Sequence, residues 1–212
     1  MNNIVKIIET RGNCEAIMSD FFSICKRNKF PDYLVRQSGY NYILFASSLF
    51  YVQYEYNQFV DMQNKFGFDE YYVLPTDLAN MCNDDWDEYE KQHLHKRETK
   101  INYFPLLNIK GQPNFEDIQK KYINEYHILL TEFFVFTPKL DWIVQHIAHR
   151  NTSILHYNQD LEIDTLDLLE DKINSYEEAL VNCNDWGDGF NQKEKDALKA
   201  FWFSSGNGED LK

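Results

Sequence analysis

The sequence predicts an all-α fold, with about seven helices in an irregular bundle and one short strand or extended segment near residues 71–75. Apolar residues recur at helical spacing along most of the chain. The most apolar stretch, residues 38–66, is far longer than a strand, which rarely exceeds about 10 residues. With only 8 Gly and 5 Pro in 212 residues, the chain is also poor in the residues that make the turns of a β-sandwich.

The first two helices are predicted from their apolar positions and from the residues that end them. Residues 15–29 place an apolar stripe on one helix face, and Pro31 closes this helix because proline disfavours helix at the residue before it. Residues 38–66 carry apolar groups on every side, which is typical of a helix buried in a bundle. Their many Tyr and Phe also suit a strand, and length decides for helix. Gly67 is expected to end this second helix.

The middle of the chain is predicted to hold two helices separated by a loop. After the extended segment, Thr76 has the properties of an N-cap for a helix over 77–97. Residues 99–113 contain two prolines and a glycine, which indicates a loop. Asn114 can cap a long helix whose apolar stripe continues to Phe133.

Three further helices are predicted in the last third of the chain. Pro138 separates the long helix from a short one over 140–147. Another helix is expected over 164–180, because leucines recur at helical spacing there. Asn191 and Glu194 have the spacing of a capping box, which would start the final helix.

The whole chain is expected to form one domain, residues 1–212, with a frayed tail from about residue 204. The loop at 99–113 is the alternative boundary between two subdomains. The four cysteines, at positions 14, 25, 82 and 183, lack the spacing of a zinc or redox motif. The longest apolar run, 40–52, is shorter than the about 20 residues that span a membrane. The simplest interpretation is a cytoplasmic protein with buried, reduced thiols and no membrane partner.

The charge of the chain argues against one class of partner and is compatible with another. With 34 acidic and 21 basic residues, the net charge is −13, so a nucleic-acid binder with a broad basic face is disfavoured. The excess lies in two zones, 61–100 with 10 acidic and 5 basic residues, and 151–212 with 14 and 5. Such zones either keep a protein soluble or present a negative surface to a basic partner, and composition leaves both open.

The sequence shows no motif for a cofactor or for catalysis. Its glycines are scattered, so no phosphate-binding loop is expected. Residues 182–193 depart from a calcium loop, because Trp186 and Lys193 stand where oxygen ligands are needed. Nucleophile-elbow, kinase and zinc-protease motifs are absent. We therefore expect no catalytic residue, no metal and no cofactor.

An enzyme is the first alternative. His146 and His149 are three residues apart on a predicted helix and would share one face, where they could hold a metal. Asp141 and Glu125 are the candidate carboxylates of such a site. No Glu-x-x-His motif accompanies the histidines, so whether they bind a metal stays open. The second alternative is a structural homo-oligomer, such as a homodimer, held together by the many Tyr and Phe.

The candidate partner-binding residues come from a recurring motif and from acidic stripes. Cys-Asn-Asp followed closely by Trp and Asp occurs at 82–87 and again at 183–188. A tryptophan among carboxylates combines a common interface anchor with negative charge. The candidates are Asp84, Asp85, Asp87, Glu88, Asp164, Asp167, Asp171, Asp185, Trp186 and Asp188.

These features favour a non-enzymatic, acidic protein-binding module. Inhibitors of toxic enzymes, such as immunity proteins and antitoxins, are often small, acidic and without catalytic motifs. Such a protein would occlude a basic surface or the active site of a toxin or enzyme, with carboxylates where the target expects phosphates. No direct contact with nucleic acid or membrane is expected.

Overall fold

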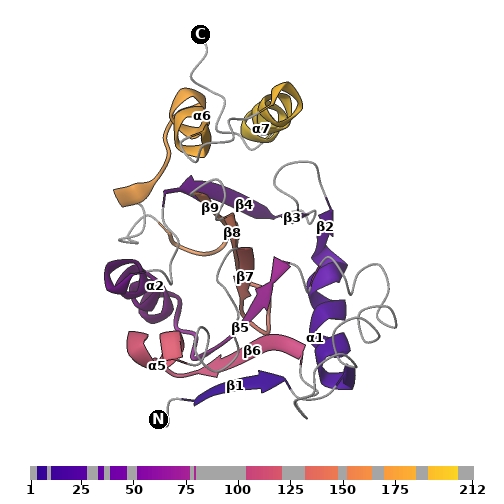
Figure 1. The fold of residues 1–212 in the computed structure, drawn as a ribbon, viewed down its shortest axis with the longest axis vertical. Coiled ribbons are helices and arrows are strands. Elements are labelled where there is room, and N and C mark those ends of the chain that lie inside the picture. The colour runs from indigo at the N-terminus through magenta and orange to yellow at the C-terminus, as the bar shows by residue number, and fades with distance from the viewer. Residues whose placement is uncertain are drawn as a thin grey trace.

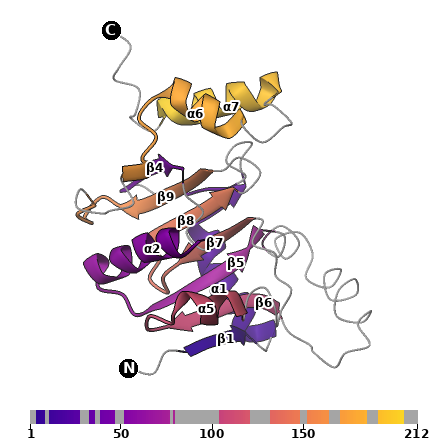
Figure 2. The same ribbon diagram turned by 60° about the vertical axis from the view of Figure 1, so that its left-hand side comes forward.

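A computed structural model describes residues 4–8, 11–27, 33–35, 39–46, 52–76, 79, 104–120, 132–147, 152–163, 170–184 and 191–204. Its centre is a seven-stranded antiparallel sheet with helices on both faces (Figure 1). The all-α prediction is therefore wrong. The turned view shows the same layers, with α6 and α7 lying beyond the strand β4 and β1 at the opposite end of the sheet (Figure 2).

The strands of the main sheet follow the order β1-β6-β5-β7-β8-β9-β4, and each neighbouring pair is antiparallel. Their bounds are β1 Ile4–Ile8, β4 Tyr40–Phe45, β5 Glu70–Pro75, β6 Phe104–Lys110, β7 Glu132–Phe136, β8 Trp142–Ile147 and β9 Thr152–Asn158. Two further strands, β2 Cys25–Arg27 and β3 Tyr33–Val35, form a separate antiparallel pair.

Five α-helices lie in the described part of the chain: α1 Arg11–Ile24, α2 Gln53–Phe66, α5 Phe115–Gln119, α6 Tyr176–Asn184 and α7 Gln192–Ser204. The helices α2 and α5 cover one face of the sheet, where Phe59 and Ile118 pack against strand residues such as Tyr71 and Trp142. The opposite face, called here the α1 face, carries α1 over one half and α6 with α7 over the other half.

The strands of this sheet could not be recognised from the sequence pattern, because helices cover both faces of the sheet. A strand that is buried on both sides has no polar face, so its apolar residues do not alternate with polar ones. All six residues of β8 are buried, and four of the five in β7 are buried. Their apolar residues do not alternate with polar ones, so the pattern resembles that of a buried helix. This explains why 140–147, expected to be helical, is in large part the strand β8.

Three other predicted elements are corrected in the same way. The apolar stretch 38–66 divides into the strand β4 and the helix α2, so only its second half is helical. The predicted loop at 99–113 contains the strand β6, which pairs with both β1 and β5. Phe133, expected on the long helix, lies in β7. Residues 121–131, between α5 and β7, lie outside the described residues.

Three features defined by local side-chain chemistry were predicted correctly. Gly67 ends α2 in a left-handed conformation, with φ of 68°. Asn114 caps α5, because its side chain accepts a hydrogen bond from the backbone N–H of Asp117. Asn191 and Glu194 form the expected capping box, with reciprocal bonds of 2.9 and 3.1 Å at the start of α7.

Three more predictions have mixed outcomes. The extended segment at 71–75 belongs to β5, as expected. The first helix begins four residues earlier than predicted and gives way to the strand β2 at Cys25. The hydroxyl of Thr76 has no hydrogen-bond partner in the described structure, so it does not act as an N-cap. The predicted helix at 77–97 lies almost wholly outside the described residues.

Candidate functional site

Of the ten candidate partner-binding residues, the structure describes only Asp171. The other nine lie outside the described residues: Asp84, Asp85, Asp87, Glu88, Asp164, Asp167, Asp185, Trp186 and Asp188. Residues 164–169 lie outside the described residues; of the rest of the helix expected over 164–180, only the part from Tyr176 is α-helical, and Asp171 lies in a short turn of 3₁₀ helix instead. Asp171 is therefore not part of a regular helical stripe.

The backbone around Asp171 adds to the outer edge of the sheet. Lys172 forms an isolated antiparallel bridge with Phe45 at the end of β4. Ala46 N–H donates to the carbonyl of Asp171 at 2.9 Å, and Ile173 N–H donates to the carbonyl of Leu44 at 2.9 Å. Because these bonds fix the chain on both sides of residue 172, Glu170 and Asp171 are held at the edge of β4 next to the start of α2.

One hydrogen bond from Gln58 connects Asp171 to the helix α2. Gln58 Nε2 donates to Asp171 Oδ2 at 2.9 Å and lies 3.2 Å from the hydroxyl of Tyr54. The Tyr54 hydroxyl in turn donates to Glu170 Oε2 at 3.5 Å. Tyr54 is 54% exposed, and the neighbouring Val52 is 49% exposed. We call Val52, Tyr54, Glu170 and Asp171, together with the buried Gln58 that supports them, the tyrosine–acid surface.

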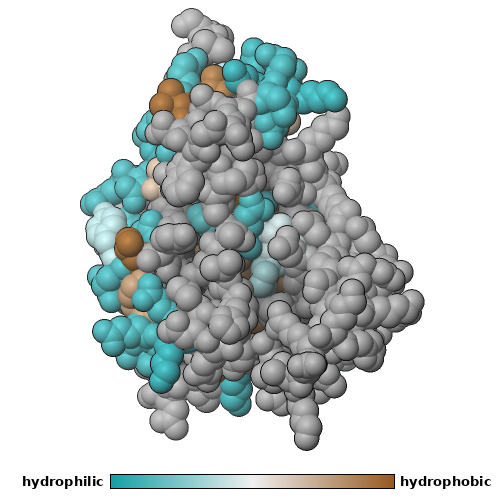
Figure 3. Space-filling view, viewed as in Figure 1, coloured by the Kyte–Doolittle hydropathy of each residue, from teal (hydrophilic) through white to brown (hydrophobic). Residues whose placement is uncertain are grey.

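The tyrosine–acid surface is electrostatically negative. Desolvation and then the charges of Asp171 and Glu170 raise the pKa of Tyr54 above its ordinary value. Within the part of the chain that the structure describes, neither carboxylate forms an ion pair; the ion pairs seen are Lys65 with Asp61 and Lys110 with Glu70. Figure 3 shows that the flank of the molecule over α2 is mostly hydrophilic with small apolar spots, as expected of such a surface.

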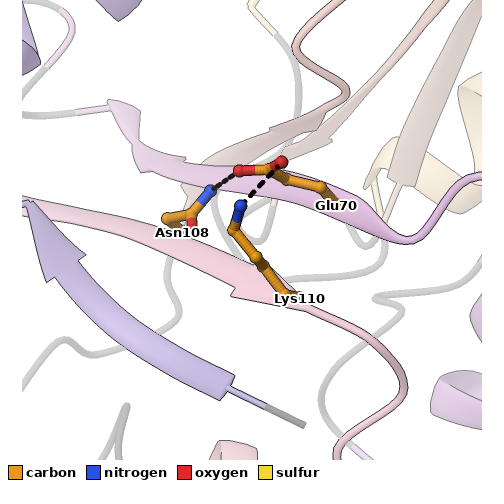
Figure 4. Close-up of polar contacts among 3 residues, drawn as sticks. All are labelled: Glu70, Asn108 and Lys110. Atoms are coloured by element: carbon orange, nitrogen blue, oxygen red, sulfur yellow. Dashed lines mark hydrogen bonds and ion pairs between the residues drawn. The ribbon is translucent and has the colours of Figure 1, made fainter. Parts of the chain in front are cut away.

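A second polar cluster, on β5 and β6, differs because its carboxylate is neutralised. Glu70 accepts a hydrogen bond from Asn108 Nδ2 at 2.7 Å and pairs with Lys110 Nζ at 3.0 Å (Figure 4). Both oxygens of Glu70 are therefore engaged within the chain. This cluster stabilises the pairing of two strands and leaves little negative charge for a partner.

Of the two histidines of the enzyme alternative, only His146 lies in the described residues, and it is not on a helix as expected. His146 lies on the strand β8 and is buried, where Nδ1 is 3.0 Å from the hydroxyl of Ser153 and the ring packs on Phe133. Asp141 precedes the opposite end of the same strand, about 16 Å away at the usual strand rise. His149 and Glu125 lie outside the described residues. Within the described ranges, no group of three or more metal-binding side chains is present.

Sequence reasoning missed Tyr54, Gln58 and Glu170. Tyr54 and Gln58 are four residues apart on α2, so their proximity was readable once the helix was known. Their contact with Glu170 and Asp171 bridges more than 110 residues of sequence. No local sequence pattern predicts a contact between residues so far apart in the chain, since the contact depends on how the edge of the sheet lies beside α2.

Compared with protein-family models, with curated proteins and with solved structures, the chain gives no significant match. No helix in the described ranges has both the length and the apolar character needed to cross a lipid bilayer.

Proposed function

We propose that this protein is a non-enzymatic, acidic protein-binding module of the inhibitor, immunity or antitoxin type, which acts in the cytoplasm. It docks the tyrosine–acid surface on a basic surface or active site of a partner protein. The observation that carries this proposal is the pair Glu170 and Asp171, which forms no ion pair within the described structure, beside the half-exposed Tyr54.

The chemistry of this surface suits a lysine- or arginine-rich partner. Tyrosine supplies a large rigid contact with a polar tip and is frequent among the residues that dominate interface energies. Carboxylates that form no ion pair within the described residues attract cationic groups and speed association through long-range attraction. The net charge of −13 adds to this attraction.

The surface is also preorganised. Asp171 is held through its backbone by Ala46 and through its side chain by Gln58. A partner that binds Asp171 therefore does not have to order a free loop, and less conformational entropy is lost on association. Rigidity of this kind is what an inhibitor needs in order to occlude a fixed active-site cleft.

The proposal is tested by capture of partners from the native host with tagged protein, washed at low and at high salt. The double variant Glu170→Lys/Asp171→Lys should lose the captured protein, because both contact charges are reversed. The matched control is Asp160→Lys/Glu162→Lys, which makes the same change of net charge at two exposed residues just after the last residue of β9, Asn158. This control should still capture the partner protein.

Equal loss in both double variants would show that only net charge matters, and the proposed surface would be wrong. Retention in both would remove the tyrosine–acid surface from partner binding. A captured protein that is acidic, or one whose retention is independent of salt, would also contradict the proposal, since screening weakens attraction between exposed charges.

A further inference from the structure

The α1 face of the sheet contains two buried polar side chains on adjacent central strands. Gln145 on β8 and His156 on β9 are each 2% exposed. Gln145 pairs directly with Ile154, and His156 pairs directly with Ile143, so Gln145 and His156 are diagonal neighbours on one face. Diagonal neighbours across an antiparallel pair have Cα atoms about 7–8 Å apart, which suits two side chains that share a small third group.

These two side chains lie between the part of the α1 face that packs against α1 and the part that packs against α6 and α7. Along β8, Ile143 belongs to the cluster under α1, and Ile147 belongs to the cluster under α6 and α7. Gln145 stands between them. Along β9, Ile154 belongs to the α6–α7 cluster and His156 follows it toward the α1 side. We call Gln145 and His156 together the polar seam, because they separate two apolar cores on one sheet face.

Each side chain of the polar seam carries a buried atom without a partner. Among the described residues, Oε1 of Gln145 and Nδ1 of His156 form no hydrogen bond. Buried polar atoms in folded proteins are nearly always satisfied, either by the protein or by an internal water. Two such atoms on neighbouring positions of one face therefore point to a shared partner.

We propose that Gln145 and His156 together bind one internal water molecule, which bridges Oε1 of the amide to Nδ1 of the imidazole. Water suits both atoms, because it donates to Oε1 and either donates to Nδ1 or accepts from its N–H, whichever tautomer is present. An ion does not suit them, since neither side chain supplies a compensating charge. Burial lowers the pKa of His156 to about 3, which keeps the ring neutral.

The surroundings of the polar seam hold this water in place. Tyr42 lies across from His156 in the register of β4 and β9, and their ring centroids are 5.6 Å apart. Tyr42 also stacks on Phe201 of α7 at 4.8 Å, so the helix closes this side of the site. A water enclosed in this way exchanges slowly with the solvent and is observable as a long-lived site.

The proposal is tested by NMR cross-relaxation between water and the side chains of Gln145 and His156. In the wild-type protein we expect a cross-relaxation signal between water and these side chains, with the sign that marks a long-lived bound water. The contact should disappear in Gln145→Leu and in His156→Phe, because each variant removes one of the two anchors. Ile154→Val, directly across from Gln145, changes packing without removing a polar atom and should keep the contact.

A double-mutant cycle provides a second measurement in case one spectrum is unreadable. Each single variant raises the equilibrium constant of unfolding by some factor relative to the wild type. In the double variant Gln145→Leu/His156→Phe, this factor should be at least about threefold smaller than the product of the two single factors, because neither side chain then remains without its partner. No long-lived water in the wild type, a contact that survives in both single variants, or simple multiplicative effects would overturn the proposal.

Discussion

The buried imidazole of His156 makes folding stability sensitive to mild acid. Burial lowers the pKa of His156 from 6.5 to about 3 in the folded protein, while the unfolded chain keeps the ordinary value. The unfolded state therefore binds more protons than the folded state at every pH between these two values. By linkage, the stability that this residue contributes is fully present above about pH 6.5 and is lost as the pH falls toward 3.

The magnitude follows from the difference between the two pKa values. Each pH unit below the unfolded value costs about 1.4 kcal/mol, so His156 alone lowers the free energy of unfolding by about 2 kcal/mol between pH 8 and pH 5. For a chain of this size, a loss of about 2 kcal/mol lowers Tm by about 4–8 °C. Among the described residues, the polar groups facing His156 are Tyr42 and Gln145, and neither supplies a charge that would offset this cost.

The assay is urea unfolding, followed by circular dichroism, for the wild type and for His156→Phe at pH 8, 6.5 and 5. Carboxylates titrate in both proteins, so the informative quantity is the difference between their free energies of unfolding at each pH. This difference should shift by about 2 kcal/mol in favour of the variant at pH 5. Where His156→Phe does not fold, His156→Asn serves the same comparison. Parallel pH profiles of variant and wild type would refute the reasoning.

Three further predictions concern local structure and the proposed surface. Gly67→Ala should destabilise the protein by about 1 kcal/mol, because φ at this position is 68° and alanine is strained there. Gly12→Ala, with nothing within 4 Å of the added carbon, should stabilise α1 by about 0.5–1 kcal/mol. Thermal unfolding of the two variants compares these effects. Asn191→Ala removes an oxygen that caps α7 and should cost about 1 kcal/mol in the same assay, and an unchanged Tm would show that α7 frays without consequence. Tyr54→Ala should weaken partner binding, measured by calorimetry, by at least about fivefold, and undiminished affinity would remove the ring from the interface.

Local chemistry was the part of the fold that the sequence could specify. The turn at Gly67, the cap at Asn114 and the box at Asn191 and Glu194 each depend on one or two residues that interact with a nearby backbone group. Such interactions are encoded within four positions of each other. These three were predicted correctly because each depends on residues close in sequence, whereas Thr76, also predicted as a cap, forms no such bond within the described residues.

The sheet was missed because its signal is tertiary. In β8 every residue is buried, so the alternation that distinguishes a strand from a helix is absent. Which face each residue occupies depends on α2 and α5 covering one side and on α1 with α6 and α7 covering the other. The tyrosine–acid surface was missed for the same reason, since Gln58 meets Asp171 through the tertiary placement of residues 170–173 against the end of β4.

The tyrosine–acid surface, proposed here as the partner-binding surface, lies at the outer edge of the sheet. An outer strand exposes unpaired backbone groups, which attract other strands and favour aggregation. Along the end of β4, the segment around Lys172 satisfies part of this edge, and the same segment carries Glu170 and Asp171. The residues that close the edge thus also supply the negative charge, so the carboxylates project from a backbone that the sheet itself holds. The negative charge of Glu170 and Asp171 thus lies at the strand edge itself, where charged side chains discourage pairing with another sheet.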